Sequence, residues 1–167
     1  MIKIDIILKI AKKLKMMEHQ KRIPEKLKNL PGIIAFHGMG SGKTLTAINA
    51  ANKLGIPAVA VVPASLRENF KKELDKFFVH TGKTPDIRVM SYEEFSKIPP
   101  NMKDKMLILD EAHRIKNESS ARSKVILEKS REAEKRLLLT GTPVQNKPHD
   151  ISMLVNVASG KDILPTN

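Results

Sequence analysis

An eight-residue stretch, HGMGSGKT at positions 37–44, combines glycines, a lysine and a hydroxyl residue at a spacing that suits phosphate binding. The small residues that let the backbone turn tightly and approach an anion are Gly38, Gly40, Ser41 and Gly42. Lys43 can reach the β- and γ-phosphates of a nucleotide, and the Thr44 hydroxyl can bind magnesium. The strict pattern has glycine at the position of His37, so the stretch is either a variant phosphate loop or a glycine-rich turn that binds nothing.

The neighbouring sequence favours the phosphate loop. The apolar run IIAF comes directly before the stretch, and a helical pattern, TLTAINAANKL, follows it. A strand that enters such a loop and a helix that leaves it direct backbone N–H groups and the positive end of the helix dipole at an anion. We therefore predict a site for a nucleoside triphosphate and Mg²⁺.

A pair of carboxylates follows another apolar run, MLIL at 106–109, where the chain reads DEAH at 110–113. A carboxylate at the end of a buried strand can hold magnesium, and a second one beside it can orient or deprotonate the attacking water. We expect Asp110 to bind the metal and Glu111 to act on the water, with Lys43 completing the catalytic group. Alone, the motif could be the acidic start of a loop. A role in binding magnesium and activating water requires a phosphate loop in the same domain.

Five short apolar runs, separated by helical patterns, must position these groups. The runs are IIAF at 33–36, AVAVV at 58–62, DIRVM at 86–90, MLIL at 106–109 and RLLL at 136–139. Continuous apolar runs of this length are typical of parallel strands that are buried on both faces. The expected fold class is therefore α/β, a three-layer, doubly wound parallel sheet that binds ligands at the carboxyl ends of its strands.

Capping signals predict where the helices begin and end. Ser65 with Glu68, and Ser91 with Glu94, have the spacing of a capping box. Gly55 is a typical closing residue for the helix that follows the phosphate loop. These signals place a helix after each of the first three strands.

The composition narrows the class of protein. Thirty basic against eighteen acidic residues give a formal net charge of +12, which favours contact with a polyanion, either nucleic acid or an anionic membrane. There is no cysteine, which excludes a disulfide framework and thiol catalysis. The sequence has neither the run of about eighteen apolar residues that a membrane span needs nor a secretory signal. We expect an intracellular protein, cytoplasmic or nuclear, that is not secreted.

The first seventeen residues differ in character from the rest. Residues 1–17 are expected to form an amphipathic basic helix ahead of a single domain over 18–167. The apolar positions that recur at helical spacing are Ile6, Ile10, Leu14 and Met17. Such a helix most often packs on its own domain, and the alternative is that it lies on a membrane surface.

Five stretches, in this order along the chain, resemble motifs of the first motor lobe of superfamily-two helicases. They are HGMGSGKT, VVPASL (61–66), SYEEF (91–95), LILDEAHRIKNESSARSK (107–124) and LLLTGTPVQN (137–146). The resemblance covers about residues 18–157 and is greatest for Swi/Snf-type DNA-dependent ATPases, whose phosphate loop does not have glycine at its first position. It implies a RecA-like P-loop NTPase lobe that binds ATP and Mg²⁺ and couples hydrolysis to translocation on duplex DNA.

The resemblance also implies roles residue by residue. It assigns phosphate and magnesium to Gly40, Gly42, Lys43 and Thr44, magnesium also to Asp110, and the hydrolytic water to Glu111. The residues implied to couple hydrolysis to movement are His113, Thr140, Gly141 and Thr142. His19-Gln20 lies where the family has an adenine-reading glutamine, so Gln20 is an expected adenine contact.

Contacts to nucleic acid are implied for segments after the second and third strands. The residues expected to hold the phosphates of one duplex strand are Pro63, Ala64, Ser65, Arg67, Ser91 and Tyr92. Aromatic residues are 4% of the chain and Trp is absent, which argues against base stacking and suits an electrostatic grip that weakens with salt. Four basic residues could either contact DNA or belong to a solvated face: Lys71, Lys72, Arg122 and Lys124.

In the resembling family, a second RecA-like lobe supplies an arginine to the ATP held between the lobes, and these 167 residues have no room for that lobe. We therefore expect ATP binding with low turnover unless a second lobe is supplied in cis or in trans. One alternative is an unwinding helicase of RNA or DNA, which typically has S-A-T where this chain has T-G-T. Another is a non-catalytic, nucleotide-dependent interaction module, against which Glu111 argues.

Overall fold

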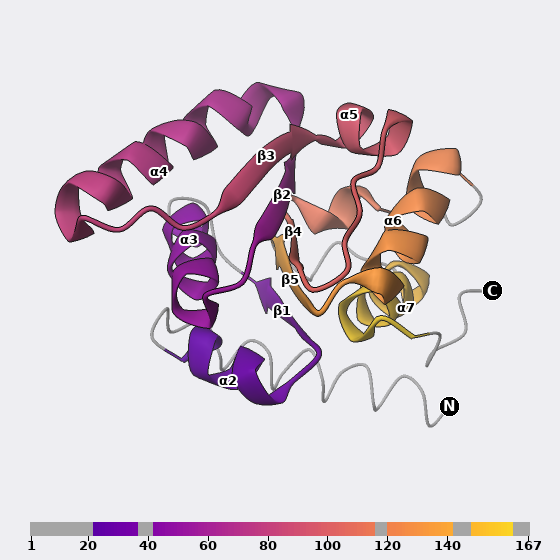
Figure 1. Ribbon diagram of the computed structural model, residues 1–167. Coiled ribbons are helices and arrows are strands. Elements are labelled where there is room, and N and C mark those ends of the chain that lie inside the picture. The colour runs from indigo at the N-terminus through magenta and orange to yellow at the C-terminus, as the bar shows by residue number, and fades with distance from the viewer. Residues whose placement is uncertain (1–21, 37–41, 116–119, 142–147, 162–167) are drawn as a thin grey trace.

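In the computed structural model, a single parallel sheet runs through the described residues, which are 22–36, 42–115, 120–141 and 148–161 (Figure 1). Its strands are β1 (Gly32–Phe36), β2 (Ala58–Val62), β3 (Ile87–Ser91), β4 (Met106–Leu109) and β5 (Lys135–Thr140). The strand order is β1-β5-β4-β2-β3, and every neighbouring pair is parallel. The five predicted strands are confirmed, with β3 shifted along the chain by one residue and β5 longer at both ends.

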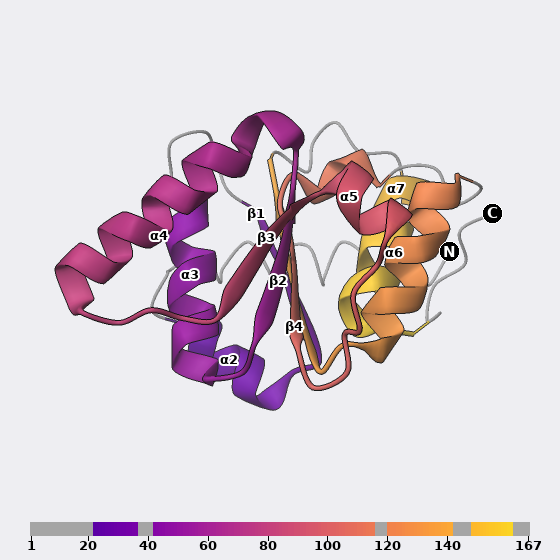
Figure 2. The ribbon, with the colours of Figure 1, turned by 45° about the horizontal axis from the view of Figure 1, so that its top comes forward.

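Helices cover both faces of this sheet, so the predicted three-layer, doubly wound architecture is confirmed (Figure 2). One face carries α2 (Ile23–Asn29), α3 (Lys43–Leu54) and α4 (Arg67–Thr81). The other carries α5 (Tyr92–Lys97), α6 (Ala121–Glu132) and α7 (Pro148–Ser159). Two short 3₁₀ turns, η1 (Ala64–Leu66) and η2 (Ala112–Arg114), follow β2 and β4 at the carboxyl edge of the sheet.

The central strands are apolar throughout because they pack against helices on both sides. Every residue of β2 and β4 is buried. Phe70 of α4 closes the core on one face and Ile126 of α6 closes it on the other, each 1% exposed. Burial of one such side chain contributes about 1.5–3 kcal/mol to folding. This core fixes the carboxyl edge of the sheet, from which the loops that carry the polar residues extend.

The helix signals are confirmed in part. Gly55 ends α3 with a left-handed φ of 69°, and the Ser91 hydroxyl accepts a hydrogen bond from the Glu94 N–H at 3.1 Å. The predicted cap at Ser65 is wrong, because α4 begins at Arg67. The chain first makes the η1 turn, in which the Leu66 N–H bonds the Pro63 carbonyl at 2.8 Å.

A buried arginine holds the opposite, amino edge of the sheet together. Arg136 in β5 is 6% exposed. Its guanidinium donates to the backbone carbonyls of Pro31 at 3.0 Å, Ala133 at 2.7 Å and Ser130. Burial lowers the pKa of Arg136, while the charge of Glu134 opposes that shift. This set of hydrogen bonds ties the start of β1 to the end of α6.

The helix predicted for residues 1–17 and the adenine contact predicted at Gln20 lie outside the described residues. The predicted division between residues 1–17 and 18–167 is therefore still a prediction. Within the described ranges, no helix has both the length and the apolar character that a membrane span requires.

Candidate active site

Three neighbouring strands bring the predicted catalytic residues to one edge of the sheet. Lys43 begins α3 after β1, Asp110 follows β4, and Thr140 ends β5, which lies between β1 and β4. Because all three strands run in the same direction, their carboxyl ends meet. The structure therefore places Lys43 and Asp110, predicted to be catalytic, at the same edge as Thr140, predicted to couple hydrolysis to movement.

Lys43 forms the centre of a charged cluster with the two carboxylates. Its ammonium Nζ donates to Glu111 Oε1 and lies 3.2 Å from Asp110 Oδ1. Gly42 precedes it as the N-cap of α3, with a φ of 71° that favours glycine. The Gly42 carbonyl accepts the N–H of Thr46 at 3.0 Å and its hydroxyl at 3.1 Å. The end of the phosphate loop is thereby fixed to the first turn of α3.

Asp110 is held from three sides and is 2% exposed. Its N–H donates to the Val61 carbonyl at 2.9 Å, its Oδ1 accepts the Glu111 N–H at 2.9 Å, and its own carbonyl accepts the Tyr92 hydroxyl at 2.6 Å. Burial raises the pKa of Asp110 above its ordinary value, and the adjacent Lys43 only partly opposes this shift. These hydrogen bonds orient the carboxyl group, but burial destabilises its charged form.

The pKa of Lys43 is also raised. Burial lowers it, but the hydrogen bond to Glu111 and the charges of Asp110 and Glu111 raise it by more. The ammonium therefore stays charged at neutral pH, as a ligand for phosphate must.

Replacement of Asp110 by asparagine is expected to raise the melting temperature of the ligand-free protein at neutral pH. Because the pKa of Asp110 is higher in the folded than in the unfolded state, its contribution to stability is lost as pH rises through the folded pKa. A neutral amide removes this penalty and can still accept the Glu111 N–H. Each kcal/mol gained would raise the melting temperature by about 2–4 °C.

Thermal melts without nucleotide or magnesium would measure this effect. The difference should vanish below about pH 4, where the carboxyl is protonated in both states. Asp75→Asn is the matched control, because Asp75 is exposed on α4. An Asp110→Asn protein that is no more stable than wild type at neutral pH would contradict the assigned direction.

Glu111 and His113 extend the cluster to β5. Glu111 has left-handed backbone angles, φ 53° and ψ 46°. His113 Nε2 lies 3.3 Å from Glu111 Oε2, and His113 Nδ1 lies 3.1 Å from the Thr140 hydroxyl. The imidazole thus bridges the second carboxylate and the end of β5. Gly141 follows Thr140 directly and is half-buried.

Of the other predicted ligands of phosphate and magnesium, only Thr44 lies within the described residues. Thr44 is half-buried in the first turn of α3. The predicted residues Gly38, Gly40, Ser41 and Thr142 lie outside the described part of the chain. Their roles therefore stay predictions.

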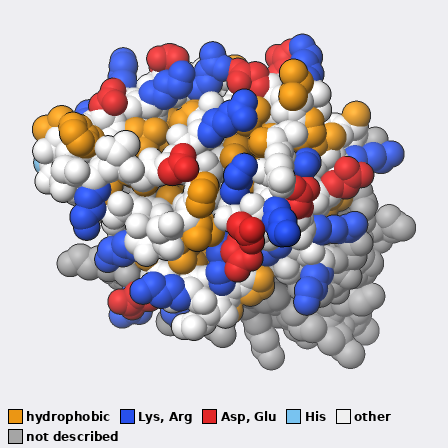
Figure 3. All heavy atoms as spheres, viewed as in Figure 1, with side chains coloured by type: hydrophobic (Ala, Val, Ile, Leu, Met, Phe, Trp, Pro, Cys, Tyr) orange, Lys and Arg blue, Asp and Glu red, His pale blue; other side chains and the backbone are white. Residues whose placement is uncertain are grey.

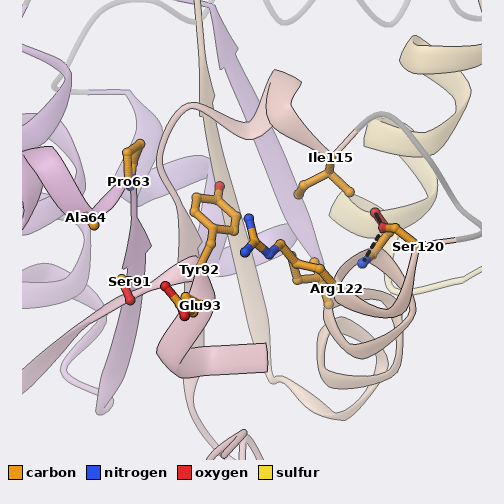
Figure 4. Close-up of a pocket in the computed structure, with 10 residues that line it drawn as sticks. Pro63, Ala64, Ser91, Tyr92, Glu93, Ile115, Ser120 and Arg122 are labelled. Atoms are coloured by element: carbon orange, nitrogen blue, oxygen red, sulfur yellow. Dashed lines mark hydrogen bonds between the residues drawn. The ribbon is translucent and has the colours of Figure 1, made fainter. Parts of the chain in front are cut away.

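Four of the six residues predicted to contact nucleic acid surround one cavity of about 510 Å³ (Figure 4). They are Pro63, Ala64, Ser91 and Tyr92. The other two do not line it: Ser65 is exposed in η1, and Arg67 pairs with Glu94. The residues that meet them from across the cavity include Ile115, Ser120 and Arg122.

The opposite wall of the cavity was incompletely predicted. Arg122 was one of four basic residues left undecided, and its side chain reaches from α6 into the cavity (Figure 4). Of the others, Lys71 pairs with Glu68 at 3.7 Å, whereas Lys72 and Lys124 are exposed. Ile115 and Ser120 were not predicted. The only signal near them in the sequence was a serine, Ser120, of the kind that typically caps a helix. In the structure its hydroxyl accepts the Ser123 N–H at 3.1 Å, and α6 begins there, beside the cavity.

The donor set suits a magnesium–nucleotide complex. A lysine ammonium suits phosphate oxygens, and carboxylate and hydroxyl oxygens suit Mg²⁺, which typically takes only one or two protein carboxylates beside phosphate. Lys43, Thr44 and Asp110 are such a set at the carboxyl edge of the sheet. Together with the parallel α/β sheet, they define a RecA-like ATPase-core domain.

Comparison with known proteins specifies the family. Residues 80–162 match the family model of the SNF2-related domain. A protein of Acanthamoeba polyphaga mimivirus, named as an ATP-dependent RNA helicase, is 34% identical over 159 residues, which cover 89% of this chain and 33% of that protein. An ISWI chromatin-remodeling complex ATPase of Saccharomyces cerevisiae is 32% identical over 157 residues, covering 76% of this chain and 14% of that protein.

A solved structure is also similar to this chain. The Sulfolobus solfataricus SWI2/SNF2 ATPase core in complex with double-stranded DNA matches with a TM-score of 0.67 and 25% identity, over 86% of this chain and 34% of that one. The chain thus carries a match to the SNF2-related domain over residues 80–162 and is similar to the SWI2/SNF2 ATPase core over 86% of its length. It spans a third or less of the length of the curated relatives described above.

Proposed function

We propose that this chain is the first, ATP-binding lobe of a DNA-dependent ATPase that couples hydrolysis of Mg-ATP to translocation on duplex DNA. The observation that carries the proposal is the cluster of Lys43, Asp110 and Glu111 at the carboxyl ends of β1 and β4. Relatives named as ATP-dependent helicases and remodeling ATPases support the reaction, and the neighbour solved with double-stranded DNA supports the substrate.

The chain's own residues divide the work of hydrolysis. Asp110 and Thr44 would hold a magnesium ion, which would supply neutralisation of phosphate charge and polarisation of the transferred phosphoryl group. Lys43 would exchange its carboxylate partners for phosphate oxygens. This exchange leaves Glu111 free to accept a proton from the attacking water. The phosphate loop, with Gly38, Gly40, Ser41 and Gly42, supplies further backbone donors.

Coupling to movement is proposed to pass through His113. The imidazole lies between Glu111 and Thr140, so a shift of the Glu111 carboxylate changes the hydrogen bond at the end of β5. Thr140 leads directly into Gly141 and Thr142. A second RecA-like lobe, in cis or in trans, would receive this movement and supply an arginine to the bound nucleotide.

Duplex DNA is proposed to lie against the cavity and the loops beside it. Over the face in Figure 3, basic side chains are interspersed with acidic ones among the described residues, so no single broad basic patch forms there. The proposed grip is therefore a set of phosphate contacts at strand and helix ends. The sequence T-G-T at positions 140–142 favours a translocase over an unwinding helicase. A protein that acts on DNA is expected in the cytoplasm or the nucleus.

Binding of a short duplex to the 167-residue polypeptide tests the substrate. Affinity should fall as salt rises from about 50 to 200 mM, with a log–log slope of about −0.9 for each phosphate contact. Single-stranded DNA and duplex RNA of equal length are the controls. Tighter binding of either control would favour the unwinding helicase, and binding that does not depend on salt would contradict the phosphate grip.

Turnover of ATP by the same polypeptide tests the enzyme class. We expect ATP to bind and to be hydrolysed slowly, with or without duplex, because an arginine from a second lobe typically raises turnover by about 10³–10⁵. Brisk DNA-stimulated hydrolysis would contradict the need for that lobe. If a matching second lobe were added and hydrolysis stayed absent, the chain would be the nucleotide-dependent interaction module instead.

A further inference from the structure

Tyr92 contacts both the cavity and the backbone of Asp110, whose carboxylate belongs to the charged cluster. It is the first residue of α5, is 6% exposed, and forms part of the cavity wall (Figure 4). From this position its hydroxyl donates to the backbone carbonyl of Asp110 at 2.6 Å. One side chain therefore joins a surface cavity to the peptide between Asp110 and Glu111.

That peptide is held in an unfavourable conformation. Glu111 has a φ of 53° and a ψ of 46°, a left-handed state that costs a residue with a side chain about 1–2 kcal/mol. Such states persist only where surrounding contacts fix them, and they cluster at functional sites. Here the contacts are the Tyr92 hydroxyl on the Asp110 carbonyl and the Asp110 carboxylate on the Glu111 N–H.

Two further hydrogen bonds connect the cavity wall to the chain around the peptide between Asp110 and Glu111. Pro63 lines the cavity and follows β2, whose Val61 carbonyl accepts the Asp110 N–H at 2.9 Å. Ile115 lines the opposite side, and its N–H donates to the Ala112 carbonyl at 3.0 Å, which closes the η2 turn after Glu111. A ligand that orders the cavity wall thus acts on both ends of the catalytic peptide.

We propose that Tyr92 is a positioning residue that couples occupancy of the cavity by DNA to binding of nucleotide at Lys43, Asp110 and Glu111. The proposal rests on the function proposed above and adds the route by which one ligand acts on the other. A duplex strand that packs against Ser91 and Arg122 restricts the Tyr92 side chain. The hydroxyl then holds the Asp110 carbonyl more firmly, and Glu111 stays in its left-handed conformation.

Thermodynamic coupling between the two ligands tests this route. The dissociation constant of a non-hydrolysable Mg-ATP analogue is measured with and without saturating duplex, in wild type and in Tyr92→Phe, which keeps the ring and removes only the hydroxyl. We expect duplex to tighten analogue binding about fivefold or more in wild type, the lower end of typical coupling. In Tyr92→Phe we expect the ratio to fall below about twofold, since the hydroxyl is the side-chain contact between the cavity wall and the Asp110 carbonyl.

Ser96→Ala is the matched structural control. The Ser96 hydroxyl donates to the Tyr92 backbone carbonyl at 2.8 Å, so its removal also takes one hydrogen bond from α5 but spares the Tyr92 hydroxyl. This variant should keep the wild-type ratio. A Tyr92→Phe protein that keeps the wild-type ratio, or a Ser96→Ala protein that loses it equally, overturns the proposal.

A spectroscopic measurement keeps the test independent of variants. Tyr92 is the only tyrosine of the chain, so incorporation of 3-fluorotyrosine gives one ¹⁹F resonance that reports on this side chain alone. We expect that resonance to shift when the Mg-ATP analogue is added without DNA, and again when duplex is added. If both ligands bind and neither moves the resonance, the proposal fails while the proposed function stands. If duplex or analogue does not bind wild type at all, the proposed function fails first.

Discussion

Replacement of Lys43 by alanine is expected to weaken binding of a non-hydrolysable Mg-ATP analogue by about tenfold to a hundredfold. A hydrogen bond between charged groups contributes about 1.5–3 kcal/mol, and 1.4 kcal/mol is a factor of ten in affinity. The loss also leaves Asp110 and Glu111 next to each other without their shared cation. Both effects act against the approach of phosphate.

The matched control lies on the same helix. Lys53 is exposed in the last turn of α3, so Lys53→Ala makes the same change of charge away from the cluster. Titration calorimetry of the three proteins with the analogue measures the difference. Equal affinity of the Lys43→Ala and Lys53→Ala proteins would remove Lys43 from the site.

Replacement of Arg136 by methionine is expected to lower the free energy of unfolding by about 2–6 kcal/mol, because two of the three carbonyls that the guanidinium contacts lose their donor, at about 1–3 kcal/mol each. The Pro31 carbonyl keeps the Arg136 backbone N–H at 3.1 Å. The three carbonyls belong to Pro31, Ser130 and Ala133. Methionine has a similar length, so the change removes the donors while most of the volume stays filled. Relative to a typical total of about 5–15 kcal/mol, the loss is large.

Chemical denaturation with urea measures this loss as a change in the transition midpoint at constant slope. Arg88→Met is the control, because Arg88 is an exposed arginine in strand β3. A midpoint that falls equally in both variants would show that the loss of one positive charge, and not the three hydrogen bonds, sets the stability.

The sequence was most informative about the fold where apolar residues form unbroken runs. The runs AVAVV and MLIL became strands β2 and β4 because helices bury them on both faces. The predicted run began at Arg136 and missed Lys135, the polar residue with which β5 begins. The structure accepts Arg136 in a buried strand only because backbone carbonyls surround its guanidinium. No spacing rule predicts a partner of that kind.

The site, like the fold, could be predicted where it follows from the strands themselves, and not where it depends on contacts between distant segments. That Lys43 and Asp110 lie at one edge follows from the parallel direction of β1 and β4, whereas their contact also requires that only β5 lies between these strands. The hydrogen bond from Tyr92 to Asp110 depends on β2 lying between β3 and β4, and on the way α5 turns back over the sheet. Likewise, Arg122 joins the cavity only through the placement of α6. Such contacts between distant segments have no signature in a single sequence.

The central claim is that ATP binds at the carboxyl ends of β1 and β4. An NMR titration of the isotope-labelled protein with a Mg-ATP analogue tests it most directly, through the backbone amide resonances. We expect the largest shifts at Gly42, Lys43, Thr44 and Glu111, and we expect these shifts to be lost in Lys43→Ala. Largest shifts in another part of the molecule, such as the groove formed by Leu45, Asn49 and Phe77 between α3 and α4, would contradict it.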